Sequence, residues 1–120
     1  MADTERRMVA IFRADVDLPP GKLAAQAGHA FLTAWRKAYE ADEAAALDYA
    51  NDMQTKIVLL APDLATLERI EAKAKLRGVH TALITDAART VLPEPTVTVL
   101  GLGPMSKTDC NALTRGLPML

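Results

Sequence analysis

The sequence predicts an α/β fold, and three observations lead to that prediction. Two short apolar runs, residues 8–12 and 56–60, are rich in strand-forming residues and too short for typical helices. A long alanine-rich segment with helical periodicity lies between them. A second helical segment follows the run at 56–60 and leads to a third apolar run. Strands that alternate with helices are typical of α/β domains.

The first strand is expected over residues 8–12, because the turn-prone segment 15–20 follows it. The first helix is expected from Gly21 to about Tyr39. Its apolar residues at helical spacing are Leu23, Ala27, Ala30, Ala34 and Ala38. A second helix is expected over residues 44–51, with Asp42 and Glu43 as its caps.

The second strand, residues 56–60, precedes a helix with Asp63 as its expected N-cap. The apolar face of that helix comprises Leu64, Leu67, Ile70 and Ala74. Gly78 stands where a left-handed residue ends a helix, and a third strand follows over about residues 80–85. Two buried strands joined by one helix predict a βαβ unit with parallel strands and a right-handed crossover.

A polar loop over residues 86–95 leads to a fourth strand at 97–102, which Gly103-Pro104 is expected to end. The last helix is predicted to begin at Ser106, because Ser106 and Asp109 have the spacing of a capping arrangement. It is predicted to end at residues 116–118, which include a glycine and a proline.

The composition limits the kinds of protein this chain can be. Its 120 residues, half of them hydrophobic, predict one domain over 1–120. The 14 lysines and arginines nearly balance the 15 acidic residues, which excludes a charge-driven disordered chain and argues against a strongly basic coat for nucleic acid. Cys110 is the only cysteine, so a disulfide scaffold is excluded and a reducing cytoplasm is expected. The chain has no apolar run of the roughly 20 residues that a membrane-spanning helix needs.

A polar stripe lies along the first predicted helix. Its members, spaced by four, three and four residues, are Lys22, Gln26, His29 and Thr33. At its start, the free backbone N–H groups, the helix dipole and the Lys22 ammonium are able to hold an anion. A solvated helix face has the same spacing, so both interpretations stay open at this point.

Asp86 ends the third predicted strand, where ligand crevices form in open α/β sheets. With Arg89 and Thr90 it places an acceptor, a guanidinium and a hydroxyl within five positions. Such groups orient water, bind phosphate and donate to an oxyanion, respectively. The alternative is that Asp86 caps a turn and pairs with Arg89 at the surface.

No metal or cofactor is expected. The two histidines and Cys110 lack the spacing of metal ligands. The segment at 101–104 lacks the third glycine of a dinucleotide-binding loop, and no G-x-S-x-G nucleophile motif is present. His29 is a candidate general base or a helix-packing residue, and His80 is interpreted as structural.

The chain resembles the peptidyl-tRNA hydrolase 2 family from Met8 to Leu117. The segments that carry the resemblance are GKLAAQAGHA at 21–30, KIVL with APD at 56–63, DAART at 86–90 and TVLGLGP at 98–104. Their order and spacing along one short chain make the resemblance specific. It implies a four-stranded mixed sheet with helices on both faces, a homodimer, and hydrolysis of the ester between a peptide and the 3′ end of tRNA.

The resemblance also implies site residues. The family's active-site lysine and histidine fall on Lys22 and His29, and its aspartate and threonine fall on Asp86 and Thr90. We expect Asp86 to orient or deprotonate the attacking water, with help from His29, and Lys22 and Thr90 to stabilise the oxyanion. Residues expected to bind the substrate are Gln26, Arg89, Thr98, Arg13 and Arg36. The basic residues expected to contact the tRNA phosphates are Arg13, Lys22, Arg36, Lys37 and Arg89. Lys73, Lys75 and Arg77 are further candidates if the end of their helix faces the same way.

The chain departs from the family pattern at three places. It has Thr85 where the family has glutamine, Ala88 where the family has glycine, and Glu94-Pro95 where the family has a Gly-Ser pair. These departures, with the near-zero net charge, motivate two rival hypotheses. One is a non-catalytic dimeric binding or regulatory protein on the same fold, and the other is a hydrolase of a smaller ester or amide.

Overall fold

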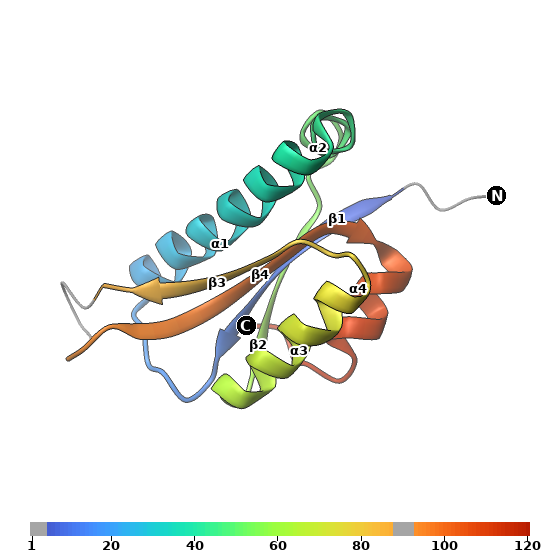
Figure 1. The fold of residues 1–120 in the computed structure, drawn as a ribbon. Coiled ribbons are helices and arrows are strands. Elements are labelled where there is room, and N and C mark those ends of the chain that lie inside the picture. Colours follow the sequence, from blue (N-terminus) through green and yellow to red (C-terminus); the bar gives the residue numbers. More distant parts are fainter. Residues whose placement is uncertain (1–4, 88–92) are drawn as a thin grey trace.

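The computed structural model describes residues 5–87 and 93–120 and has an α/β architecture, as predicted (Figure 1). Its elements are β1 Arg6–Arg13, α1 Pro20–Ala41, α2 Glu43–Ala50, β2 Lys56–Ala61, α3 Leu64–Leu76, β3 Thr81–Asp86, β4 Thr96–Ser106 and α4 Lys107–Thr114. Each corresponds to an element expected from the sequence. The predicted site residues Arg89 and Thr90 lie outside the described residues, as does the family departure at Ala88.

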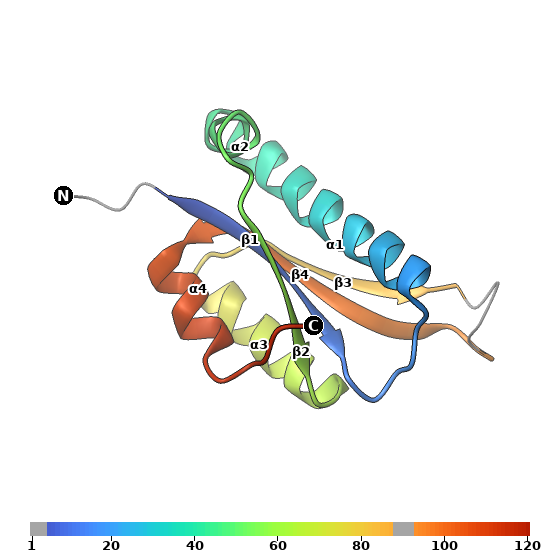
Figure 2. The same cartoon turned by 180° about the vertical axis from the view of Figure 1, so that it is seen from behind.

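The four strands form one mixed sheet in the order β2-β1-β4-β3. Strand β1 pairs in parallel with β2, and β4 pairs antiparallel with both β1 and β3. Helices α1 and α2 cover one face of the sheet, while α3 and α4 cover the other (Figures 1 and 2). The mixed sheet with helices on both faces is therefore confirmed.

The βαβ unit predicted around α3 differs from the observed one. Strands β2 and β3 run in the same direction, but they form opposite edges of the sheet with β1 and β4 between them. The neighbouring parallel strands are β1 and β2, which α1 and α2 connect. The alternation of strands and helices gives the direction of each strand, but it does not reveal which strands insert between two others.

Strand β4 is longer than predicted, and the expectation that Gly103-Pro104 ends it is wrong. It continues to Ser106 and pairs with Arg6 and Arg7 of β1. The register of the two strands shifts opposite Gly103 and Pro104, so the proline, which has no N–H, falls at an irregularity where the ladder needs no donor.

The position of α1 follows from its small residues. Ala30, Ala34 and Ala38 are buried against the sheet. The closest approach is to Gly101 of β4, where an added Cβ would lie 2.4 Å from the carbonyl oxygen of Ala30. The small residues of α1 pack this closely on β4, and the polar stripe of α1 lies beside the neighbouring strand β3.

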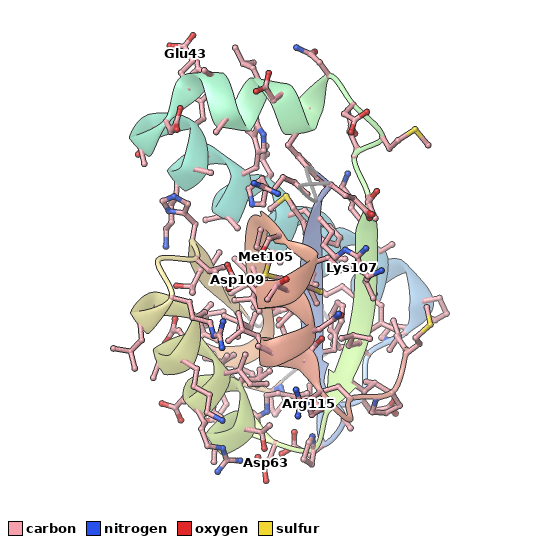
Figure 3. All side chains as sticks on the ribbon, turned by 90° about the vertical axis from the view of Figure 1, so that its right-hand side faces the viewer. Glu43, Asp63, Met105, Lys107, Asp109 and Arg115 are labelled. Atoms are coloured by element: carbon pink, nitrogen blue, oxygen red, sulfur yellow. The ribbon has the colours of Figure 1, made fainter. Side chains whose placement is uncertain are left out.

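The predicted N-caps of three helices are confirmed, whereas Glu43, also predicted as a cap, is the first residue of α2. Asp42, Asp63 and Ser106 each accept a hydrogen bond from a backbone N–H in the first turn of the helix that follows. Gly78 has a φ of +72° just after α3. Figure 3 shows Asp63 at the start of α3 and Asp109 in the first turn of α4. No helix in the described parts of the chain is long and apolar enough to cross a membrane.

Candidate active site

A cavity of about 600 Å³ lies between the polar stripe of α1 and the end of β3. Its lining residues are Lys22, Gln26, His29, Thr33, Leu83, Ile84, Thr85, Asp86 and Ala87. The whole predicted stripe of α1 therefore faces the carboxylate that ends β3. The four polar residues therefore line a cavity, and they do not form a merely solvated face of α1.

Asp86 is the buried centre of this site. Its side chain is 4% exposed, and its Oδ2 lies 2.9 Å from Nζ of Lys22, whose side chain is 27% exposed. The Nε2 of Gln26 donates to the same oxygen at 3.3 Å. A buried carboxylate needs such partners, because the loss of its hydration is otherwise costly. Asp86 is therefore not the surface group of the alternative interpretation, while Arg89, its partner in that interpretation, lies outside the described residues.

The orientation of the Gln26 amide is fixed from its other side. Oγ1 of Thr98, on β4, donates to Oε1 of Gln26 at 2.8 Å, which leaves the amide nitrogen to face Asp86. Gln26 is 5% exposed and Thr98 is 1% exposed. A chain of hydrogen bonds thus runs from the middle of the sheet through α1 to the carboxylate, and buried networks of this kind hold their members rigidly.

The first turn of α1 brings Lys22 to this carboxylate. Pro19 precedes the helix and Pro20 occupies its first position, where a missing N–H costs nothing. Pro19 contributes no side-chain hydrogen bond, so no side chain of the N-cap competes for the first N–H groups. The positive end of the helix dipole and the Lys22 ammonium therefore both favour negative charge here.

His29 and Thr33 line the cavity further along α1. His29 is exposed and Thr33 is partly buried. Their place on the cavity wall agrees with the predicted stripe. Leu83, Ile84 and Thr85 of β3 also line this cavity, although the sequence predicts only a strand there. The signal for them was their position directly before the carboxylate on an edge strand.

Three of the cations predicted to bind phosphate, Arg13, Arg36 and Lys37, differ in the contacts they make. Arg13 makes a two-pronged pair with Asp15, at 2.9 and 3.0 Å, and also donates to the carbonyl of Val97. This pairing lowers the pKa of Asp15 from its ordinary value of 3.8 and raises that of Arg13. Arg36 is exposed on α1. Lys37 donates from α1 to the carbonyl of Thr81 at 2.7 Å.

The three conditional candidates for phosphate contacts lie away from the cavity. Lys73, Lys75 and Arg77 are at the end of α3, which packs on the face of the sheet opposite to α1 (Figure 1). Arg77 is paired with Asp109 of α4 at 2.9 Å. These three residues were candidates only if their helix end faced the site, and it does not.

A second hollow, of about 390 Å³, lies on the far side of α1 and is mostly apolar. Phe31, Trp35 and Tyr49 contribute to its lining, and the Lys56 ammonium lies over the rings of Phe31 and Tyr49. Burial raises the pKa of Tyr49 to about 12, and its hydroxyl donates to the carbonyl of Thr55 at 2.9 Å. No carboxylate is among the described residues that line this hollow, whereas the cavity at Asp86 holds a buried carboxylate beside an ammonium group.

Comparisons with known proteins match the chain to one family. The family model described as "Peptidyl-tRNA hydrolase PTH2" matches residues 6–120. A Methanopyrus kandleri protein named "Peptidyl-tRNA hydrolase" is 38% identical over 114 residues, which cover 95% of this chain and 97% of that protein. "Peptidyl-tRNA hydrolase 2" of Saccharomyces cerevisiae is 36% identical over 121 residues, and the chain spans 58% of its length.

A solved structure shares the fold alone. It is a protein of unknown function from Agrobacterium tumefaciens, with a TM-score of 0.57 and 12% sequence identity. The match covers 100% of this chain and 99% of that one. It supports the α/β arrangement over the full length of the domain.

Proposed function

The chain belongs to the peptidyl-tRNA hydrolase PTH2 family and is thus an ester-hydrolysing enzyme. From this premise we propose that it cleaves the ester between a peptide, or an N-blocked amino acid, and the 3′ end of tRNA by attack of water at the Asp86 site. The observation that carries the proposal is the contact of the buried Asp86 carboxylate with Lys22 and Gln26 in one cavity.

In the proposed reaction, Asp86 accepts a proton from the attacking water as the water oxygen bonds to the ester carbon. The Lys22 ammonium stabilises the negative charge that develops on the carbonyl oxygen. The bond to the ribose oxygen then breaks, and the proton passes to that leaving oxygen. Thr90 is a further donor to the oxyanion on the strength of the family resemblance, and His29 assists the proton transfer.

Gln26 and Thr98 act in this proposal by positioning Asp86. Both side chains are buried, and their hydrogen bonds run to one another and to the carboxylate. A carboxylate that is held in one orientation does not have to reorganise during the reaction. We therefore assign them to the support of Asp86, although the sequence suggested substrate contacts.

The tRNA partner needs positive charge around the cavity, since contacts with phosphates dominate affinity for nucleic acid. Lys22 and Arg36 lie on α1, and Arg89 follows β3 in the sequence. Arg13, which is paired with Asp15, contributes less net charge. We propose that these residues follow the acceptor end of the tRNA.

The proposal also includes a homodimer that works in the cytoplasm. Light scattering on the purified chain measures its mass in solution and tests the dimer against a 12.9 kDa monomer. Fractionation of cells with an antibody against the chain tests the location.

The central test measures release of an N-acetylated amino acid from charged tRNA. Lys22→Ala and Asp86→Asn are each expected to lower kcat/KM at least about 100-fold, which is the usual effect of losing an oxyanion donor or a proton acceptor. The control is Lys73→Ala, which removes a lysine from the other face of the sheet and is expected to retain full activity. Circular dichroism checks that the variants fold.

Each result decides between the hypotheses. Activity that survives both Lys22→Ala and Asp86→Asn would rule out this site. A wild-type chain that binds tRNA at low salt without cleaving it would favour the non-catalytic binding protein. A wild-type chain that cleaves only small esters would favour the hypothesis of a hydrolase for a smaller ester or amide.

A further inference from the structure

We infer that the groove between α1 and the edge of β3 holds the peptide part of the substrate, as an extended strand that runs parallel to β3. The inference rests on the proposed function, because the peptide enters as part of peptidyl-tRNA. It adds where that peptide lies, how it is held and how many of its residues are bound.

The outer side of β3 carries main-chain groups that β4 does not use. The N–H of Gly103 on β4 donates to the carbonyl of His80 at 3.0 Å. Residues of an antiparallel strand alternate between bonding the neighbour and pointing away from it. With the observed register, Ala82 therefore bonds to β4, while Thr81 and Leu83 direct their N–H and C=O groups outward.

A contact at the start of β3 agrees with this alternation. Nζ of Lys37 donates to the carbonyl of Thr81 at 2.7 Å, so that carbonyl does point away from β4. Lys37 thereby closes one end of the edge. Between this contact and Asp86, the outward groups belong to Leu83, which lines the cavity.

The polar stripe of α1 forms the opposite wall of the groove. From Lys22 to Thr33 the helix advances about 16 Å at about 1.5 Å per residue. An extended peptide covers that length with about five residues at about 3.3 Å each. When the ester lies at Lys22 and Asp86, the fifth residue before it therefore lies beside Thr33.

The lining of the groove favours a peptide over a ribose-phosphate chain. A nucleic-acid strand carries one negative charge per nucleotide and is held mainly by lysine and arginine. Beyond Lys22, no lysine or arginine is among the described residues that line this cavity. An exposed strand edge instead offers donors and acceptors that match another main chain.

Main-chain pairing also suits the chemistry of the substrate. Hydrogen bonds to an edge strand recognise the backbone and leave the choice of side chain open. The peptides that are joined by an ester to tRNA differ in sequence, so a groove that binds their main chain accepts them all. Because β3 runs toward Asp86 and the peptide's C-terminal residue carries the ester, the two strands are parallel.

The test compares two substrates, N-acetyl-aminoacyl-tRNA and tRNA that carries an N-acetylated hexapeptide. For the wild-type enzyme we expect a higher kcat/KM for the hexapeptide substrate than for the single-residue substrate. Thr33→Trp fills the far end of the groove and is expected to lower kcat/KM for the hexapeptide substrate at least about 10-fold, with no change for the single-residue substrate. Thr33→Tyr repeats the test with a smaller ring.

The matched control is Leu32→Trp. Leu32 directly precedes Thr33 on the same helix, but it is 66% exposed and lines the apolar hollow on the far side of α1. This variant is expected to treat both substrates as the wild type does.

The remaining outcomes separate the two proposals. A wild-type enzyme without activity on the single-residue substrate contradicts the proposed function itself. Activity that is independent of peptide length, or a loss in Thr33→Trp that is equal for both substrates, overturns the peptide path alone. Weaker binding of uncharged tRNA by Thr33→Trp shows that the groove holds RNA, which also overturns it.

Discussion

The two edges of the sheet are treated differently in this molecule. At the β2 edge, the C-terminal residues add a short antiparallel segment: the N–H of Leu60 donates to the carbonyl of Pro118 at 2.9 Å, and the N–H of Leu120 donates to that of Val58 at 3.0 Å. At the β3 edge, no described segment pairs with the strand, and Lys37 covers one carbonyl.

The two edges differ in how far they are covered by other parts of the described chain. Unpaired strand edges invite association with other chains, so proteins cover them or place lysines along them. Here the β2 edge is covered by the chain itself. The β3 edge ends at the carboxylate of the candidate site and lines its cavity. The edge left accessible is thus the one at which the candidate site lies.

The largest expected loss of stability comes from a substitution that moves α1, which forms one wall of the β3 groove. In Gly101→Ala the new Cβ meets the backbone of Ala30, so α1 has to move away from β4 at a cost of about 3 kcal/mol. Urea unfolding measures the loss. The control is Gly28→Ala on the same helix, which meets nothing within 4 Å and is expected to add about 1 kcal/mol of stability. Equal effects of the two variants would contradict the close approach of α1.

The second prediction removes the cover of the β2 edge. Deletion of residues 118–120 eliminates two backbone hydrogen bonds at about 1 kcal/mol each, so the free energy of unfolding should fall by about 2 kcal/mol. The kcat/KM for N-acetyl-aminoacyl-tRNA should stay unchanged, because the site lies at the other edge. A deletion that abolished activity but preserved stability would show that the two edges are not independent.

The third prediction concerns the carboxylate at the β3 edge. Gln26→Glu places a second carboxyl group about 3.3 Å from Oδ2 of Asp86. Two carboxylates so close resist ionising together, which raises the pKa of Asp86 in the variant. In the proposed reaction the ionised form of Asp86 accepts the proton, so the acidic limb of the pH profile of kcat/KM should move upward by about one unit.

A control separates this effect from added charge in general. Leu32→Glu puts the same charge on the far side of α1 and is expected to leave the acidic limb in place. An unmoved limb in Gln26→Glu would contradict the role of Asp86 as the proton acceptor.

The smallest effect is expected where α3 begins, directly after β2. Hydrogen bonds from the Thr66 hydroxyl and N–H lower the pKa of Asp63 below its ordinary 3.8. The ionised cap therefore stabilises the fold above pH 3.8, and this contribution is lost as the pH falls through the lower folded value. Asp63→Asn keeps a capping oxygen without that titration. The Tm of the wild type should fall more than that of the variant between pH 5 and pH 2.5, and parallel changes would contradict this.

Local features of the fold were predictable from the sequence. A helix cap joins residues three positions apart, as Asp63 and Thr66 or Ser106 and Asp109 do. The stripe of Lys22, Gln26, His29 and Thr33 follows from the period of one helix. The family resemblance added the four-stranded mixed sheet and the pairing of Lys22 with Asp86 in one site, which spacing alone did not supply.

Only the tertiary structure decided which distant segments meet. It places β2 and β3 at opposite edges, carries β4 through Pro104, and joins Gln26 to Asp86 and Thr98, which are 60 and 72 positions away. Periodicity and caps depend on neighbours within a few positions, so the sequence determined the elements and the polar face of α1. Strand order and the packing of α1 onto Gly101 depend on contacts across the whole chain, and these turn that face into the wall of a cavity.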